Sequence, residues 1–113
     1  MSKLTEEFLK HIIDEILFLE KTGNSLNPES FYTNVLYQKA FVRSLEIIGE
    51  AIKQVPDSFR QAHLYIDWKS FAGLRDKLIH DYMGVDYEIV WDVIKNELPP
   101  LKQKLLIILK KTA

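Results

Sequence analysis

The clearest structural signal in the chain is the segment Phe41-Val42-Arg43-Ser44-Leu45-Glu46-Ile47-Ile48-Gly49-Glu50-Ala51-Ile52-Lys53-Gln54-Val55. Its large apolar residues recur at steps of four, three, four and three. This spacing places them on one face of an α-helix. The pattern predicts an amphipathic helix from about Thr33 to Val55, and Pro56 ends it because proline cannot continue a helix.

Helical periodicity continues on both sides of this segment. Toward the N-terminus, one apolar stripe predicts a helix over residues 5–21, which Gly23-Asn24 ends. Asn27 followed by Pro28 is typical of a cap and first turn, and predicts a short helix leading into the next one. Residues 57–66 are less regular, and a turn or short helix is expected there.

Two more helices are predicted in the second half of the chain. Asp67 is expected to cap a third main helix that Gly84 breaks, and Asp86 to cap a fourth. Pro99-Pro100 predicts a kink or break, after which the apolar stripe continues to the end. No β-alternation or internal repeat occurs in the sequence. We therefore expect an all-α fold, an antiparallel bundle of four main helices plus short helices, with residues 1–113 as a single domain.

Composition limits the class of protein. The 113 residues are 47% hydrophobic, contain no cysteine, and have no apolar run of about 18 residues that could span a membrane. The acidic start does not resemble a secretory signal peptide. A cytoplasmic protein is expected, without disulfides, and three scattered histidines do not make a zinc site, so no metal or cofactor is predicted. A chain this small buries a modest share of its surface, which favours homodimerisation.

The net charge of −1 argues against a general electrostatic nucleic-acid binder. Four lysines near the C-terminus have no acidic neighbour, and a solvated helix face explains them better than an RNA-backbone contact. RNA recognition, if present, would be local to a cleft, with Lys77 and these lysines as candidate lining residues: Lys102, Lys104, Lys110 and Lys111.

The chemically distinctive segment is Arg75-Asp76-Lys77-Leu78-Ile79-His80-Asp81-Tyr82, within the third predicted helix. Arginine presents a planar fork of donors that suits phosphate. Histidine can take and give a proton near neutral pH. Arg75 and His80 together would supply what metal-free cleavage of RNA requires, a phosphate clamp beside a proton shuttle.

Helix geometry restricts how these residues can cooperate. Asp76 and His80 are four apart, so the carboxylate could orient the imidazole ring. Arg75 and His80 are about 140° apart around a straight helix, too far to meet on one phosphate. Either the helix ends or bends near His80-Asp81, or two copies of the chain assemble the site across a two-fold axis, which we favour.

Other titratable residues have simpler interpretations. His11, in the apolar first helix, and His63, in the irregular segment, lack suitable partners nearby and are interpreted as structural. Glu46 and Glu50 are expected to form salt bridges along their own helix with the flanking basic residues.

The motif Arg75-x4-His80-x-Tyr82 resembles the signature of the HEPN superfamily, in the tyrosine-bearing form of HepT-like toxins. The similarity extends over most of residues 41–98. It includes the flanking segments Arg43–Ala51, Trp68–Leu74, Gly84–Asp86 and Ile89–Trp91.

The resemblance implies a HEPN-like bundle acting as the toxin of a type VII (HepT/MntA) toxin–antitoxin system. Such a toxin is a homodimeric, metal-independent endoribonuclease with Arg75 and His80 as catalytic residues at the dimer cleft. An MntA-like nucleotidyltransferase antitoxin would bind it and silence it by attaching AMP to Tyr82. Asp76, where this family often has asparagine, would have a supporting role.

Two other functions fit the same residues. The chain could be a non-catalytic helical partner, the nucleotide-binding subunit of a minimal nucleotidyltransferase. It could also be an interaction bundle in which Arg75 and His80 only hold a dimer together. Growth arrest of a bacterial host that expresses the chain, if it depends on His80, would favour the nuclease over both of these alternatives.

Overall fold

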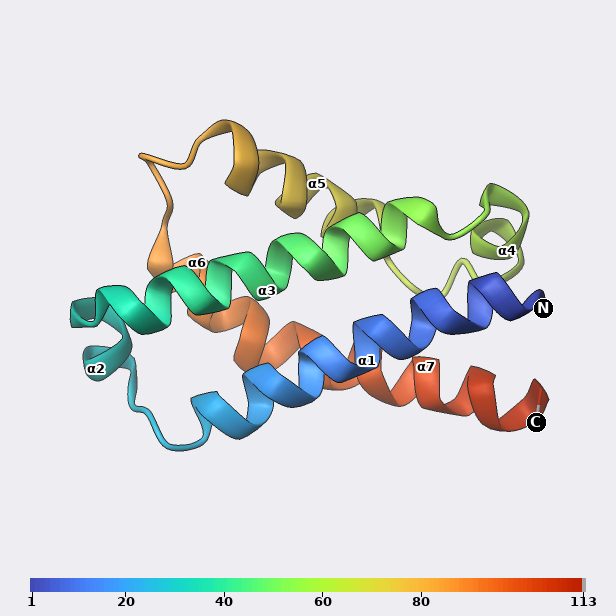
Figure 1. The fold of residues 1–113 in the computed structure, drawn as a ribbon, viewed down its shortest axis with the longest axis horizontal. Coiled ribbons are helices and arrows are strands. Elements are labelled where there is room, and N and C mark those ends of the chain that lie inside the picture. Colours follow the sequence, from blue (N-terminus) through green and yellow to red (C-terminus); the bar gives the residue numbers. More distant parts are fainter. Residues whose placement is uncertain (113) are drawn as a thin grey trace.

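A computed structural model describes residues 1–112, and every regular element in that range is helical. Four long helical stretches dominate, joined by shorter pieces, as the sequence predicts (Figure 1). The elements are α1 (Lys3–Gly23), α2 (Pro28–Thr33), α3 (Val35–Gln54), α4 (Asp57–Ala62), α5 (Trp68–His80), α6 (Tyr87–Asp92), the π-helical η1 (Val93–Glu97) and α7 (Leu98–Thr112).

The long helices run antiparallel to their neighbours (Figure 1). Helix α3 packs between α1 and α5, and α7 packs against α1. Both chain ends lie at the same end of the bundle. Within the described residues, no helix is long and apolar enough to span a bilayer.

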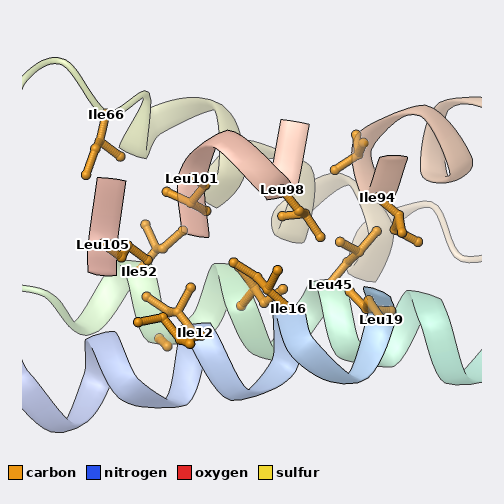
Figure 2. Close-up of a cluster of buried hydrophobic side chains, with 14 of the residues drawn as sticks. Ile12, Ile16, Leu19, Leu45, Ile52, Ile66, Ile94, Leu98, Leu101 and Leu105 are labelled. Carbon is orange, nitrogen blue, oxygen red and sulfur yellow. The ribbon is translucent and has the colours of Figure 1, made fainter. Parts of the chain in front are cut away.

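The core lies where α1, α3 and the η1–α7 stretch meet (Figure 2). The apolar stripes predicted from periodicity point into it, and burial of each leucine or isoleucine stabilises the fold by about 1.5–3 kcal/mol. The labelled core includes Ile12, Ile16 and Leu19 of α1, Leu45 and Ile52 of α3, and Leu98, Leu101 and Leu105 of α7.

Three predicted helix caps are confirmed. The side chains of Asn27, Asp67 and Asp86 each accept a hydrogen bond from a first-turn backbone N–H, at 2.8, 3.2 and 3.0 Å. These bonds satisfy donors that have no partner inside the helix. Pro28 occupies the first turn of α2, where its missing N–H costs nothing.

The short helix α2 and the long helix α3 meet at Asn34. Asn34 has an extended backbone, ends α2 and begins α3, and its side chain accepts a hydrogen bond from the N–H of Tyr37. The predicted short helix and the predicted long helix from about Thr33 are therefore both confirmed, with the long helix beginning at Val35. Phe31 of α2 is buried against Phe41, and this packing favours the bend over a straight helix.

Pro99-Pro100 does not break the last helix. Residues Val93–Glu97, which end two positions before Pro99, form a π turn in which the N–H of Leu98 donates to the carbonyl of Val93. Because a proline ring collides with the carbonyl four residues before it, a wider turn at this point lets the helix continue. The structure thus replaces the expected kink or break with a continuous helical stretch over residues 87–112.

Helix α5 ends earlier than predicted, at His80 rather than Gly84. Asp81 caps it through a backbone bond to the carbonyl of Lys77, and residues 81–84 form turns. Tyr82 is therefore outside the helix, in a loop between α5 and α6.

Candidate active site

Arg75 is positioned by a close contact between α5 and α3. Its side chain lies directly on Gly49, and a β-carbon at that position would overlap Arg75 Cβ and approach Cγ to 2.9 Å. The carbonyl oxygen of Phe71 would be only 3.0 Å away. Only glycine permits this approach, so residue 49 sets the position of the arginine.

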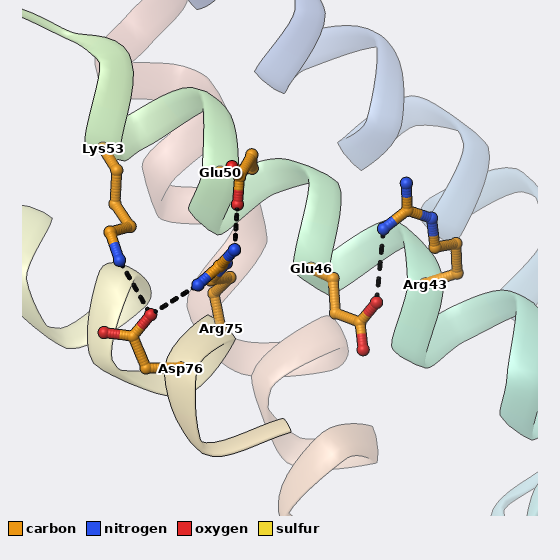
Figure 3. A network of polar contacts seen from close by, with 6 residues as sticks. All are labelled: Arg43, Glu46, Glu50, Lys53, Arg75 and Asp76. Atoms are coloured by element: carbon orange, nitrogen blue, oxygen red, sulfur yellow. Dashed lines mark hydrogen bonds and ion pairs between the residues drawn. The ribbon is translucent and has the colours of Figure 1, made fainter. Parts of the chain in front are cut away.

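The guanidinium group of Arg75 lies between two carboxylates (Figure 3). Its Nη2 is 2.6 Å from Glu50 Oε2, on α3, and its Nη1 is 2.9 Å from Asp76 Oδ1, on its own helix. The same Asp76 oxygen accepts a bond from Lys53 Nζ at 2.9 Å. The four side chains form a row of alternating charge across the α3–α5 interface, which we call the Arg75 network.

These contacts favour the charged forms of Asp76 and Arg75. The bonds from Lys53 and then Arg75 hold the pKa of Asp76 below its usual range. The bond to Asp76, together with the Glu50 charge, raises the pKa of Arg75 further above neutrality. Asp76 is thus a carboxylate matched by two cations, which reduces its repulsion of an incoming phosphate.

The structure revises two predicted pairings. Asp76 turns toward α3 and makes no hydrogen bond with His80 among the described residues, so the predicted orienting bond is not formed. Glu46 does pair with Arg43 of its own helix at 3.3 Å, as expected. Glu50 instead reaches across to Arg75, a contact between helices that spacing alone could not reveal.

His80 is the last residue of α5 and is exposed. Within residues 1–112 it makes no hydrogen bond or ion pair, and no contact joins it to Arg75. Tyr82 and Met83 follow it and are 74% and 87% exposed. The early helix end matches the first geometric alternative, but the described chain still does not bring the arginine and the histidine together.

A hollow of about 470 Å³ opens beside Arg75, between α1, α3 and α5. We call it the Arg75 hollow. Its polar lining includes Glu50 and the otherwise unpaired His11, and its apolar lining includes Ile79 at the end of α5. The full lining is Phe8, His11, Arg43, Ile47, Glu50, Ala51, Gln54, Arg75 and Ile79.

The two remaining histidines differ from each other. His63 is structural as interpreted, since its Nδ1 lies 2.8 Å from the carbonyl oxygen of Phe59 and its ring stacks on Phe59. His11 is exposed and lines the Arg75 hollow, and within residues 1–112 it makes no hydrogen bond or ion pair that would support its interpretation as structural. The sequence could have indicated this position of His11, because the spacing of Phe8, His11 and Glu15 places His11 at the edge of the apolar stripe facing α3.

No group of three histidine, aspartate or glutamate side chains in residues 1–112 is arranged to hold a metal ion. The polar side chains that line the Arg75 hollow are His11, Arg43, Glu50, Gln54 and Arg75.

Comparison with known proteins gives consistent results. The family model described as "Ribonuclease HepT-like" matches residues 9–108. "Putative RNase TTE0752" of Caldanaerobacter subterraneus subsp. tengcongensis is 45% identical, over 96% of this chain and 97% of its own length. "Gamma-glutamylcyclotransferase and putative RNase MJ0434" of Methanocaldococcus jannaschii is 40% identical, over 98% of this chain and 50% of its own length.

A third relative, "Probable ribonuclease HepT" of Thermococcus cleftensis, is 38% identical over 92% of this chain and 94% of its own length. No solved structure gives a significant match. The family match covers most of the chain, including the Arg75 network, His80 and Tyr82. The chain therefore belongs to the HepT-like ribonuclease family of the HEPN superfamily.

Proposed function

We propose that the chain is a metal-independent endoribonuclease and the toxin of a type VII (HepT/MntA) toxin–antitoxin system, with Arg75 and His80 as its catalytic residues. The observation that carries the proposal is the contrast between these two side chains. Arg75 is fixed by two carboxylates, whereas His80, five residues later, is exposed and makes no hydrogen bond or ion pair within residues 1–112. A toxin of this kind would act on RNA in the cytoplasm.

A homodimer would complete the site. Arg75 contacts α3, whereas His80 lies at the exposed end of α5, so a shared phosphate could be reached by groups from two subunits. Exposed apolar side chains beside His80 support a partner on this side: Ile79 and Met83 are both exposed. An apolar surface next to a polar site is typical of an interaction surface.

The mechanism follows from the chemistry of RNA. His80 would take the proton of a ribose 2′-hydroxyl, whose oxygen then attacks the adjacent phosphorus, or give a proton to the departing 5′-oxygen. The P–O5′ bond breaks as the new P–O2′ bond forms, leaving a cyclic phosphate and a 5′-hydroxyl. Arg75 would stabilise the charge that develops on the phosphate oxygens. Asp76, matched by Lys53, would support the arginine.

The proposal predicts dependence on the 2′-hydroxyl and independence from metal ions. Purified dimer should cleave an RNA oligonucleotide at full rate in excess chelator, and should not cleave it when a single 2′-deoxynucleotide replaces the residue before the cleaved bond. Gel analysis of end-labelled substrates measures both results. Equal cleavage of the deoxy-substituted substrate would contradict this mechanism.

We further propose that an MntA-like nucleotidyltransferase antitoxin attaches AMP to Tyr82. The exposed position of Tyr82, two residues after His80, supports this because a bound AMP would add bulk and negative charge beside the proton shuttle. With antitoxin and ATP, Tyr82→Phe should gain no AMP by mass spectrometry and should keep its nuclease activity. Tyr65→Phe, at another exposed tyrosine, is the matched control and should be modified and silenced. AMP on the Tyr82→Phe protein would contradict the assignment.

A further inference from the structure

We propose that the Arg75 hollow binds one nucleotide of the RNA substrate, next to the phosphate that is cleaved, with His11 and Gln54 as binding residues. This inference rests on the proposed nuclease function and adds a specificity subsite to it. It assigns a role to α1, a helix that carries none of the predicted catalytic residues.

The position of the hollow supports a substrate site. Arg75 lines it from α5 and Gln54 from α3, while His11 reaches it from α1. His11 is exposed and makes no hydrogen bond or ion pair in the part of the chain that the structure describes. A ligand whose phosphate lies at Arg75 would therefore extend past an imidazole ring with free donor and acceptor capacity.

The lining suits a nucleobase. At about 470 Å³ the hollow is within the range of about 300–1,000 Å³ typical of small-molecule sites. Phe8 and His11 offer aromatic faces, and Ile47 and Ile79 add apolar surface. The amide of Gln54 can both donate to and accept from a base edge. Single-stranded RNA is commonly recognised by this combination of stacking and edge contacts.

Charge favours a base over a second phosphate in the hollow. Arg75 is matched by Glu50 at 2.6 Å, and Arg43 by Glu46 at 3.3 Å. Arg43, the other guanidinium group that lines the hollow, thus already has a carboxylate partner, which leaves little attraction for a second phosphate beyond the one that Arg75 would hold. An uncharged base in the hollow, with its own phosphate near Arg75, avoids this limitation.

The first test is RNA cleavage by His11→Ala and Gln54→Ala in the dimer. Each should raise KM about tenfold, the loss expected when one base loses a stacking or edge partner, with kcat changed by less than about twofold. Sequencing of the products should show altered base preference beside the cleaved bond. Lys10→Ala is the matched control, because Lys10 is an exposed neighbour that pairs with Glu6, outside the hollow.

The second test does not depend on cleavage. Titrating the four ribonucleoside monophosphates into the dimer should shift the NMR signals of the His11 ring and the Gln54 amide, and His11→Ala should weaken binding about tenfold. Equal KM and base preference for His11→Ala and Lys10→Ala would overturn the inference. Side chains of a second subunit filling the hollow in a dimer structure would also overturn it.

The outcomes separate this inference from the proposed function. Cleavage that requires His80 but does not change in the His11 and Gln54 variants would support the proposed nuclease and contradict the proposed subsite. Mononucleotide binding at His11 without His80-dependent cleavage supports the subsite as a nucleotide site and removes the nuclease mechanism.

Discussion

The variant His80→Ala is expected to cleave RNA at least about 100-fold more slowly than the unaltered chain, because positioned proton transfer contributes about 10²–10⁴ to rate. Its stability should be nearly unchanged. The His80 side chain is exposed and makes no hydrogen bond or ion pair within residues 1–112, and surface substitutions of this type usually change stability by less than about 0.5 kcal/mol. Loss of activity with an unchanged melting curve would therefore identify a chemical role.

The matched control for His80→Ala is Lys69→Ala, which removes another exposed side chain from the same helix, near its first turn. It should retain full activity and stability. Single-turnover cleavage of a labelled RNA, together with thermal unfolding of each variant, measures both quantities. Cleavage by His80→Ala at the unaltered rate would mean that another group is the catalyst or that the activity comes from a contaminant.

Gly49→Ala should destabilise the fold by about 2 kcal/mol, in the range found for overpacked interiors. Helix propensity alone predicts the opposite, a gain of about 1 kcal/mol, since alanine is the better helix former. The added carbon would overlap Arg75 and approach the Phe71 carbonyl, so α3 and α5 would have to separate. Cleavage should decrease as well, because Arg75 would be displaced together with its helix.

Gly73→Ala provides the comparison. This glycine lies inside α5 with nothing within 4 Å of an added carbon, so the same substitution should stabilise the protein by about 0.5–1 kcal/mol. Chemical denaturation measures the free energy of unfolding of each variant. Relative to the unaltered protein, this free energy should fall for Gly49→Ala and rise for Gly73→Ala if the contact at Gly49 is as close as described. A Gly49→Ala protein as stable as Gly73→Ala would contradict that geometry.

Much of the bundle could be predicted because it follows from local rules. The spacing of Phe41, Leu45 and Ile48 already shows which face of α3 is buried. Asp67 and Asp86 cap their helices through atoms only two or three residues away. Features of this kind depend on neighbours in sequence, so the sequence contains the information needed to locate them.

The features that were missed depend on contacts between distant segments. The pairing of Glu50 with Arg75 joins two helices, and helical spacing predicted a partner for Glu50 on its own helix instead. His11 was interpreted as structural because it lies in the apolar first helix, whereas its exposed side chain lines the Arg75 hollow. The end of α5 depends on how Asp81 turns the chain, which periodicity cannot report.

The π turn at η1 sets the rotational register of α7 relative to α6. A turn that closes over five residues rather than four absorbs one extra residue, which rotates everything after it by about 100° relative to an uninterrupted α-helix. Val90, before η1, and Leu105, after it, are both buried in the same core, so the turn accommodates its extra residue without moving the apolar stripe out of that core. Relatives that gain or lose a residue in Val93–Glu97 would consequently need a compensating change elsewhere to keep α7 seated on α1.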